Sequence, residues 1–325
     1  MTSPLVAVVL PAYNEEQTIA QCIAAFAQHL PGAAIYVINN RSTDATASVA
    51  EAALEELGVL GGVIKEDRPG KGAAIRRAFL EVQADVYLMS DADLTYPADA
   101  ALALIQPILS GEADMTVGDR LSKGQYRLEN KRPFHGAGNR LVCHLVNLLY
   151  DARVRDVMSG YRAFSKRFVK TYPILVDGFE LETDLTLHAL DKRLTIRELA
   201  IDYRDRPEGS FSKLNTFRDG SRVLLTIFNI FRHFKPILFF GIGAIFSALL
   251  SLIAALPVLE DWLVYRHVYH VPLAVLATGL ALTSLLLLTI GLILDTQVRQ
   301  DRKRFELELL RLSAASPIES RPPLP

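Results

Sequence analysis

The sequence predicts an open α/β sheet in the N-terminal part of the chain, followed by a C-terminal part that is attached to a membrane. Between residues 5 and 90, short aliphatic runs alternate with helical patterns, which is typical of parallel strands that helices cover on both faces. Further along, two stretches without a charged residue, 237–256 and 271–294, are each long enough to cross a bilayer as a helix.

The globular part is expected to end at residue 214. Its predicted elements, in order, are strands at 5–10, 34–39, 62–66 and 85–90, a helix at 139–150, a strand at 159–164 and a helix at 179–189. The run 203–214 is rich in Arg, Gly and Ser, which indicates a loop that leaves a globular domain. We therefore assign residues 1–214 to one cytosolic domain.

Residues 215–235 are expected to form a helix that lies in the membrane surface. On a helical wheel, a polar set that includes Arg218, Arg222 and Arg232 falls on one side, and an apolar, aromatic-rich set falls on the other. A helix of this kind can lie among lipid headgroups. The alternative is a surface helix that packs on its own domain.

Residues 236–298 are expected to form a hairpin of two transmembrane helices. Basic residues flank both ends of the pair, whereas the connecting segment 257–270 carries Arg266 beside the acids Glu260 and Asp261. By the positive-inside rule, both ends then lie in the cytoplasm. The tail 299–325 is therefore cytosolic, and its last part, rich in Ser and Pro, is expected to be disordered.

Charge and cysteine content exclude two classes of site. The net charge of −1 offers no basic excess for binding nucleic acid. The two cysteines, Cys22 and Cys143, lie in separate helical patterns, so neither a disulfide framework nor a cysteine-rich zinc site is indicated, and a reducing compartment fits.

Polar clusters follow each of the first four predicted strands. They lie at 13–15, 39–42, 67–71 and 91–93. Because ligands of open α/β sheets bind at the carboxyl ends of the strands, we expect these clusters to converge on one crevice. The alternative is a set of ordinary solvated loops.

Asp91 and Asp93 directly follow the fourth predicted strand. Their carboxylate oxygens suit Mg²⁺ or Mn²⁺, which leave coordination positions for phosphate oxygens and water. A cation held there would neutralise charge on a departing nucleoside diphosphate. The pair therefore indicates an enzyme with a nucleotide-activated substrate, whereas a helix N-cap would explain one acid but not both.

Lys71 lies between Gly70 and Gly72. The neighbouring residues lack the other positions of a phosphate-binding loop, and no dinucleotide-binding glycine pattern follows the first strand. Lys71 therefore either faces a bound nucleotide or follows a glycine that merely opens a helix.

Five motifs together resemble family 2 glycosyltransferases. They are Val9-Leu10-Pro11-Ala12-Tyr13-Asn14-Glu15-Glu16, Ser42-Thr43-Asp44, Gly70-Lys71-Gly72, Asp91-Ala92-Asp93 and Ser159-Gly160-Tyr161-Arg162. Within that family, the sequence is similar to the polyprenyl-phosphate glycosyltransferases, the group of dolichyl-phosphate mannose synthases and bactoprenol glucosyltransferases. The resemblance covers residues 5–214, and the paired C-terminal helices match the bacterial branch of the group.

The resemblance implies a nucleotide-sugar-binding sheet of the GT-A type and a role for individual residues. Asp91 and Asp93 would hold the metal ion, Mg²⁺ or Mn²⁺, and would be catalytic together with Asp156, for which a structural role is the alternative. The residues that would bind the nucleotide sugar are Pro11, Tyr13, Asn14, Glu15, Asn40, Lys71, Asp91, Ala92 and Asp93. The residues that would bind the acceptor phosphate are Arg120, Arg132, Arg206, Ser212 and Lys213.

The chain departs from the family pattern after the second strand. Asn39 and Asn40 stand where the family has an acidic pair, and Arg41 replaces a glycine. Amides can still hydrogen-bond a base or ribose, but the identity of the nucleotide stays open. The loop 206–213 is also one residue longer than in the mannose synthases.

The predicted reaction is inverting transfer of a hexose from a nucleotide sugar, UDP-glucose first and GDP-mannose second, to a polyprenyl phosphate such as undecaprenyl phosphate. The acceptor phosphate is largely ionised at neutral pH. No general base is then required, and catalysis rests on alignment and on stabilisation of the leaving diphosphate. We expect the site on the cytoplasmic face of a bacterial inner membrane, in a protein that could form homo-oligomers.

Three other functions fit the sequence less well. A sugar nucleotidyltransferase would need a glycine-rich phosphate loop near the N-terminus, which the sequence lacks. A processive polysaccharide synthase shares the fold, but it would be expected to carry more membrane spans and a Gln-x-x-Arg-Trp motif, whereas the single tryptophan, Trp262, lies between the two spans. A catalytically inactive nucleotide-binding scaffold for a membrane complex would give no reason for paired acids at Asp91 and Asp93.

Overall fold

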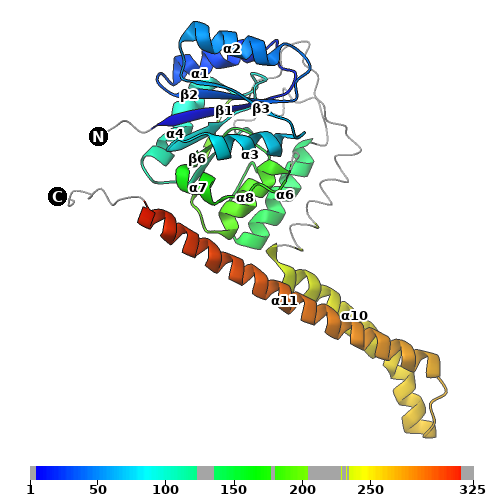
Figure 1. Cartoon of the computed structure of the whole chain (residues 1–325). Helices are drawn as coiled ribbons and strands as arrows, with labels where there is room; N and C mark the ends of the chain where they lie inside the picture. Colours follow the sequence, from blue (N-terminus) through cyan, green and yellow to red (C-terminus); the bar gives the residue numbers. More distant parts are fainter. Residues whose placement is uncertain are drawn as a thin grey trace. The chain divides into compact units, whose positions relative to one another are not determined.

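The computed structural model describes residues 5–122, 135–176, 180–203, 228, 232 and 234–315 of the 325-residue chain. The chain divides into two compact units. The first holds a sheet with its covering helices, and the second holds most of a pair of long helices (Figure 1).

Within the described residues, seven strands form one sheet in the order β3-β2-β1-β4-β6-β5-β7. The strands are β1 (Val6–Ala12), β2 (Ala34–Asn40), β3 (Gly61–Glu66), β4 (Val86–Met89), β5 (Met115–Asp119), β6 (Arg162–Ser165) and β7 (Ile196–Ala200). β1 pairs in parallel with β2 and β4, and β2 pairs in parallel with β3. The predicted open α/β sheet is confirmed, with β1 to β4 close to their predicted bounds.

The sheet is mixed rather than wholly parallel. β6 runs antiparallel to both of its neighbours, β4 and β5, while β5 and β7 are parallel. β6 also begins at Arg162 rather than at residue 159, because a turn at residues 157–158 precedes it. The expectation of parallel strands concerned residues 5–90 and is confirmed for β1 to β4; the direction of β6 was not predicted.

Helices cover both faces of the sheet (Figure 1). Among the residues of this unit that the structure describes, the helices that pack around the sheet are α1 (Ile19–His29), α2 (Thr46–Leu57), α3 (Lys71–Glu81), the short η1 (Ala98–Ala100), α4 (Ala101–Leu109), α6 (His135–Tyr150), α7 (Lys166–Thr171) and α8 (Leu181–Asp191). α1, α2 and α4 share a core with one face of the sheet, in which Ile23, Leu54 and Leu104 are buried with Val8 and Leu88.

The opposite face packs against α3 and α7. Phe79 of α3 lies edge-on to Tyr87 of β4 and Phe164 of β6, with ring centroids 5.8 and 5.7 Å apart, and Phe168 of α7 lies 4.9 Å from Phe164. Tyr87 alternates with the residues of β4 that face the other core, as successive strand residues must. Since both faces are covered, a ligand can reach the sheet only at the strand ends.

The second unit holds α10 (Pro236–Tyr265) and most of α11 (Val271–Ala315), up to Leu307. Their most apolar windows have mean hydropathies of 2.5 and 2.3, and only 11% and 6% of these windows are buried. Long helices that leave apolar surface exposed fit membrane spans and do not resemble the core helices of a soluble protein.

Both long helices extend beyond their predicted ends. α10 continues through Pro257 to Tyr265, and α11 continues to Ala315, into the segment that was predicted as a tail. The connecting loop is therefore 266–270 instead of 257–270. The Asp261 carboxylate holds this short loop, because it accepts hydrogen bonds from the backbone N–H groups of Tyr269 and His270 at 2.7 and 2.8 Å.

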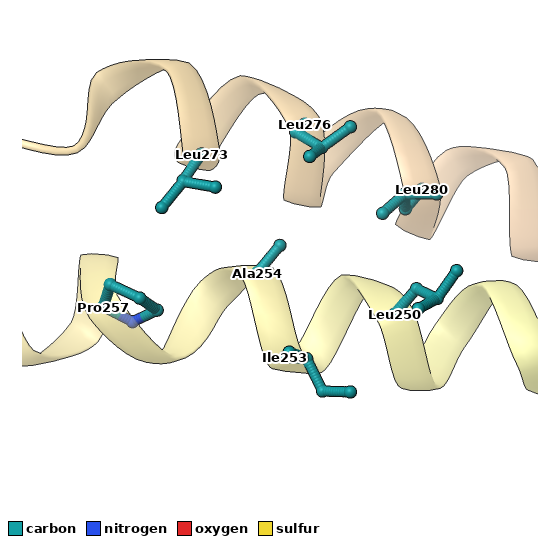
Figure 2. Close-up of a pocket in the computed structure, with 7 residues that line it drawn as sticks. All are labelled: Leu250, Ile253, Ala254, Pro257, Leu273, Leu276 and Leu280. Carbon is teal, nitrogen blue, oxygen red and sulfur yellow. The ribbon is translucent and has the colours of Figure 1, made fainter.

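Serine side chains join α10 to α11. Ser247 and Ser251 donate to the carbonyl oxygens of Leu280 and Ala277 at 2.9 and 2.7 Å, and Ser284 donates back to a carbonyl oxygen of α10 at 2.8 Å. An apolar groove runs beside these contacts (Figure 2), lined by Leu250, Ile253, Ala254, Pro257, Leu273, Leu276 and Leu280. Small polar residues of this kind are frequent where membrane helices pack together.

Three predictions concern residues that the structure does not describe. The proposed interfacial helix at 215–235 lies almost wholly outside the described residues, as does the end of the tail at 316–325. The domain boundary at residue 214 lies there too, so it stays a prediction.

Candidate active site

The first four strands end in backbone conformations that most side chains avoid. Asn14 follows β1, Arg41 follows β2 and Leu94 follows β4, with φ angles of 54°, 61° and 62°, and Gly70 after β3 has a φ of 112°. Non-glycine residues in the left-handed region are held there by their surroundings, and such residues gather at functional sites. The carboxyl edge of β1 to β4 is therefore the candidate site.

Asn14 and Asn40 fix the loops at this edge. The Asn14 amide oxygen accepts a hydrogen bond from the backbone N–H of Thr43 at 2.8 Å. The Asn40 amide donates to the carbonyl oxygen of Arg68 at 2.6 Å and accepts from the N–H of Gly70 at 2.9 Å. Both side chains shape the loops around the site, and their predicted contact with a nucleotide would use the remaining hydrogen-bonding capacity of each amide.

Pro11, Tyr13 and Glu15 lie at the end of β1. Pro11 is half-buried in the strand and Tyr13 is exposed. The Glu15 carboxylate accepts a hydrogen bond from the Thr18 hydroxyl at 3.1 Å, and its backbone N–H donates to the Thr46 hydroxyl at 2.8 Å. Glu15 is thus anchored, while the Tyr13 ring can stack against a planar ligand.

Asp91 and Asp93 differ in exposure. β4 ends at Met89, so both acids lie in the loop after the strand. The Asp91 side chain is 30% exposed, whereas Asp93 is buried and accepts a hydrogen bond from the Thr95 hydroxyl at 2.6 Å. Ala92 between them is buried. Asp91 is therefore the more accessible ligand.

The two acids fit a hard divalent cation that is only partly coordinated by protein. Across the described residues, no group of three or more His, Cys, Asp or Glu side chains lies close enough to hold a metal ion. Mg²⁺ commonly binds one or two carboxylates and completes its shell with water and substrate phosphates. Asp91 and Asp93 would serve as such a pair and would bring the cation's charge to a diphosphate.

Lys71 lies between two carboxylates from different parts of the chain. Its Nζ is 2.5 Å from Oδ1 of Asp91 and 2.7 Å from Oε1 of Glu182, and the Lys71 side chain is only 16% exposed. Burial lowers the pKa of Lys71, but Asp91 and Glu182 more than offset this effect and hold the pKa above its ordinary value. The ammonium is therefore permanently charged at neutral pH.

Gly160 lies directly against Lys71 and Asp91. A Cβ atom on Gly160 would lie 2.9 Å from Lys71 Nζ and 3.0 Å from Oδ2 of Asp91. The Gly160 backbone N–H donates to the Tyr96 hydroxyl at 2.8 Å. The loop before β6 therefore forms a wall of the site, and only glycine leaves room for the lysine and the acid together.

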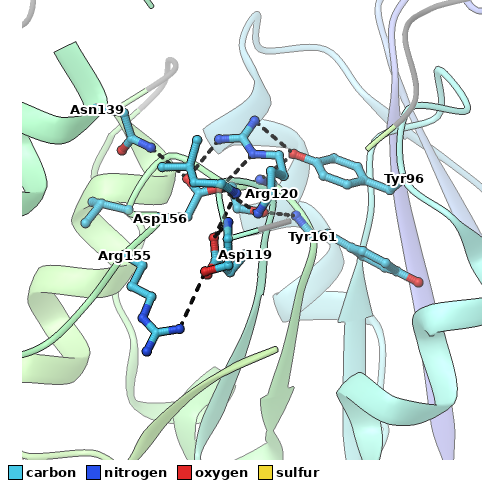
Figure 3. A network of polar contacts seen from close by, with 12 residues as sticks. Tyr96, Asp119, Arg120, Asn139, Arg155, Asp156 and Tyr161 are labelled. Carbon is cyan, nitrogen blue, oxygen red and sulfur yellow. Dashed lines mark hydrogen bonds and ion pairs between the residues drawn. The ribbon is translucent and has the colours of Figure 1, made fainter. Parts of the chain in front are cut away.

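Arg120 and Asp156 form a second ion pair (Figure 3). Nε and Nη2 of Arg120 donate to the two carboxylate oxygens at 2.8 and 2.9 Å, and the Asp156 side chain is fully buried. Burial raises the pKa of Asp156, but Arg120 and the hydrogen bonds outweigh it and lower the pKa below its usual range. Asp156 therefore holds the Arg120 guanidinium in a fixed orientation.

Two residues from distant segments hold Asp156. The Asn139 amide donates to Asp156 Oδ1 at 2.9 Å. The Glu198 carboxylate of β7 accepts the backbone N–H groups of Arg155 and Asp156 at 2.8 and 3.1 Å. Asn139 thus holds the Asp156 side chain, and Glu198 holds its backbone.

Arg162 supports the same loop from inside the protein. It is completely buried, and its guanidinium donates to the carbonyl oxygens of Val157 and Ser159 at 2.6 and 2.7 Å and to the Thr186 hydroxyl of α8 at 2.9 Å. The motif Ser159-Gly160-Tyr161-Arg162 therefore joins α8, which carries Glu182, to the loop that carries Asp156.

The structure brings together some of the predicted site residues and leaves others untested. Lys71 contacts Asp91 and Glu182, and Arg120 contacts Asp156 and Tyr96, in two groups of polar contacts; sequence reasoning missed Glu182 and Tyr96. Four predicted acceptor residues lie outside the described residues: Arg132, Arg206, Ser212 and Lys213.

Comparisons with known proteins agree on one family. The pattern described as Glycosyl transferase family 2 matches residues 7–172. Glycosyltransferase AglJ of Haloferax volcanii is 30% identical over 309 residues, which cover 94% of this chain and 98% of AglJ. A dolichyl-phosphate hexose transferase of the same organism is 29% identical, over 67% of this chain and 90% of its own length.

Solved structures share the fold. The glucosyl-3-phosphoglycerate synthase of Mycobacterium tuberculosis, crystallised with Mn²⁺, uridine diphosphate and phosphoglyceric acid, aligns with a TM-score of 0.54 at 24% identity, over 70% of this chain and 78% of that one. This similarity supports a GT-A-like arrangement of the sheet and its helices.

Proposed function

Because the chain belongs to glycosyl transferase family 2, we propose that it transfers a hexose from a nucleotide sugar to a polyprenyl phosphate. One observation carries the proposal. A single chain combines an acidic pair at the edge of a GT-A-like sheet with two helices that fit membrane spans. A protein built this way can use a water-soluble donor and a lipid acceptor. The relative named a dolichyl-phosphate hexose transferase supports the same lipid class.

The donor would bind at the carboxyl edge of β1 to β4. Asp91 and Asp93 would hold Mg²⁺ or Mn²⁺, and a structure of the same fold was crystallised with Mn²⁺ and uridine diphosphate. The cation supplies charge that stabilises the leaving diphosphate. Tyr13 would stack on the base, and Lys71, which lies beside Asp91, would donate to phosphate oxygens. UDP-glucose is the first donor that we propose, and GDP-mannose the second.

The transfer is a single displacement. An ionised oxygen of the acceptor phosphate attacks the anomeric carbon, the bond from that carbon to the diphosphate breaks, and the sugar configuration inverts. The phosphate is already deprotonated at neutral pH, so no side chain needs to remove a proton. Arg120, oriented by Asp156, would align the phosphate, and Arg132, Arg206, Ser212 and Lys213 are the other acceptor residues that we propose.

The reaction would take place on the cytoplasmic face of a membrane. Basic residues flank both ends of the helical pair, and the positive-inside rule places such ends in the cytoplasm. Two relatives named above are archaeal, so the bacterial inner membrane stays a prediction from sequence. The division into a catalytic domain at 1–214, an interfacial helix at 215–235 and a hairpin at 236–298 is part of the same proposal.

A transfer assay tests the proposal. The full chain, purified in detergent, is given labelled nucleotide sugars, undecaprenyl phosphate and Mg²⁺, with and without EDTA. We expect label from one donor to move into the organic phase, and EDTA or Asp91→Asn to stop this transfer. Asp99→Asn, which changes an exposed acid on η1, should leave it unaffected.

The other outcomes identify the alternatives. Label in an aqueous polymer would mean a processive polysaccharide synthase. Binding of a nucleotide without any transfer, across all donors offered, would mean a nucleotide-binding scaffold. Transfer that is unaffected by EDTA would remove the metal ion from the mechanism.

A further inference from the structure

The Lys71 ammonium already forms an ion pair with the carboxylate that a metal ion would need. Its Nζ is 2.5 Å from Oδ1 of Asp91, which is the more exposed of the two acids after β4. A divalent cation bound to the same carboxylate would meet an ammonium at close range in a largely buried place. Two cations so near to each other repel strongly, because the low dielectric screens them little.

Glu182 gives the ammonium a second position. Its Oε1 lies 2.7 Å from Lys71 Nζ, and its side chain is only 7% exposed, in the first turn of α8. The ammonium can therefore move away from Asp91 and stay paired, without returning to solvent. If Glu182 only stabilised the fold, it would gain little from sharing the Lys71 ammonium with Asp91.

We propose that Lys71 is a resident counter-cation of Asp91 that a divalent ion displaces, and that Glu182 is the positioning residue that retains the displaced ammonium beside the diphosphate. This inference rests on the proposed function, because it assumes that Asp91 binds a metal ion with the donor. In the empty site, Lys71 neutralises Asp91. In the loaded site, the divalent ion takes that place, and Lys71, held by Glu182, adds a hydrogen-bond donor for the leaving phosphate oxygens.

The first measurement is Mn²⁺ affinity without nucleotide, followed through the electron paramagnetic resonance signal of free Mn²⁺ with the full chain in detergent. Lys71→Met removes the competing charge, so Mn²⁺ should bind about ten-fold more tightly, which corresponds to a usual coupling between residues in contact. Lys71→Arg keeps the charge and should bind Mn²⁺ nearly as the native protein does. Lys65→Met, at an exposed lysine, is the control and should change nothing.

The second measurement asks whether Glu182 acts through Lys71. Glu182→Gln removes the alternative partner, so the ammonium stays on Asp91 and Mn²⁺ should bind more weakly. Combined with Lys71→Met, the same change should have almost no effect. Lys71→Met should also weaken the binding of uridine diphosphate in the presence of Mn²⁺, measured by calorimetry, since the donor to the phosphate is lost.

Three results would overturn the inference. Mn²⁺ affinity that is unchanged or lower in folded Lys71→Met would exclude competition at Asp91. An equal effect of Glu182→Gln with and without Lys71 would exclude a role through the lysine. Stronger diphosphate binding after Lys71→Met would exclude the retained donor. If the native protein transfers sugar and these results appear, only the exchange fails; if exchange is seen but no sugar moves, the proposed function fails instead.

Discussion

Replacing Asp156 with asparagine should destabilise the catalytic unit strongly, because Asp156 holds Arg120 in a buried pair. The Asp156 side chain is fully buried and that of Arg120 is 11% exposed. Asparagine keeps the volume of the side chain, so packing changes little. One carboxylate oxygen becomes an NH₂ group, however, and would face a donor of Arg120 or of Asn139.

The expected magnitude follows from the cost of leaving a buried charge without its partner. Removing one member of a buried ion pair destabilises a protein by about 3 kcal/mol or more. For a unit of this size, each kcal/mol lowers the melting temperature by about 2–4 °C. Asp156→Asn should therefore melt about 6–12 °C below the native protein. Asp67→Asn, which changes an exposed ion pair with Lys65, should shift the melting temperature by about 1 °C at most.

The two cysteines report unfolding of this unit. Cys22 and Cys143 are both buried, and burial raises the pKa of each thiol, for Cys143 to about 11. They should react with a thiol-activated fluorophore only after the sheet and its helices open. Trp262 lies in α10, so its fluorescence follows the helical pair and serves as an internal reference.

The pH dependence has a defined sign. The folded pKa of Asp156 lies below its unfolded value, so its stabilisation is complete above the unfolded pKa of about 3.9 and is lost as the pH falls through the lower, folded value. The difference between native protein and Asp156→Asn should therefore stay constant from pH 6 to pH 8. A melting shift below about 2 °C, or effects of Asp156→Asn and Arg120→Met that simply add in the double variant, would refute the pairing argument.

Three further changes test other parts of the structure. Gly160→Ala places a Cβ 2.9 Å from Lys71 Nζ and 3.0 Å from Asp91, so calorimetry should show uridine diphosphate binding weakened by about ten-fold, and unchanged affinity would contradict the crowding. Arg41 has a left-handed backbone conformation, which costs a non-glycine residue about 1 kcal/mol. Arg41→Gly removes this strain, so the melting temperature should rise by a few degrees and not fall. Alanine at all three interhelical serines should destabilise the helical pair by about 2 kcal/mol. The Trp262 fluorescence should then change at a lower SDS concentration during unfolding, and an unchanged SDS concentration would mean that these hydrogen bonds add no stability. Those serines are Ser247, Ser251 and Ser284.

The parallel half of the sheet could be predicted because its strands are continuous aliphatic runs. β1 and β4 are buried on both faces, and such strands show little polar alternation. β5 and β7 carry Thr116, Asp119, Arg197 and Glu198 within five-residue strands, so neither periodicity nor apolar length marks them. The antiparallel direction of β6 depends on its place between β4 and β5, which no local pattern encodes.

The site could be predicted where one short segment carries the chemistry. Asp91 and Asp93 stand together after a strand, and the pair is visible in the sequence. Glu182 and Glu198 contact the candidate site from a helix and from a strand that lie far along the chain, and each resembles an ordinary acid of its element. The burial of Asp156 was also invisible, because burial depends on how β7 and α6 close over the loop.

The Arg120–Asp156 pair limits how an acceptor phosphate can be held. The Arg120 guanidinium already donates two N–H groups to the Asp156 carboxylate, so the pair is nearly neutral. Strong attraction for the phosphate must then come from other cations, such as the predicted Arg132, Arg206 and Lys213. Because Arg120 is oriented beforehand, it can align the phosphate without further loss of side-chain freedom. Arg120→Lys keeps the charge but cannot reproduce the paired contact, so kcat should fall more than KM for the lipid rises. A higher KM with an unchanged kcat would instead make Arg120 a residue that binds the lipid and does not align it.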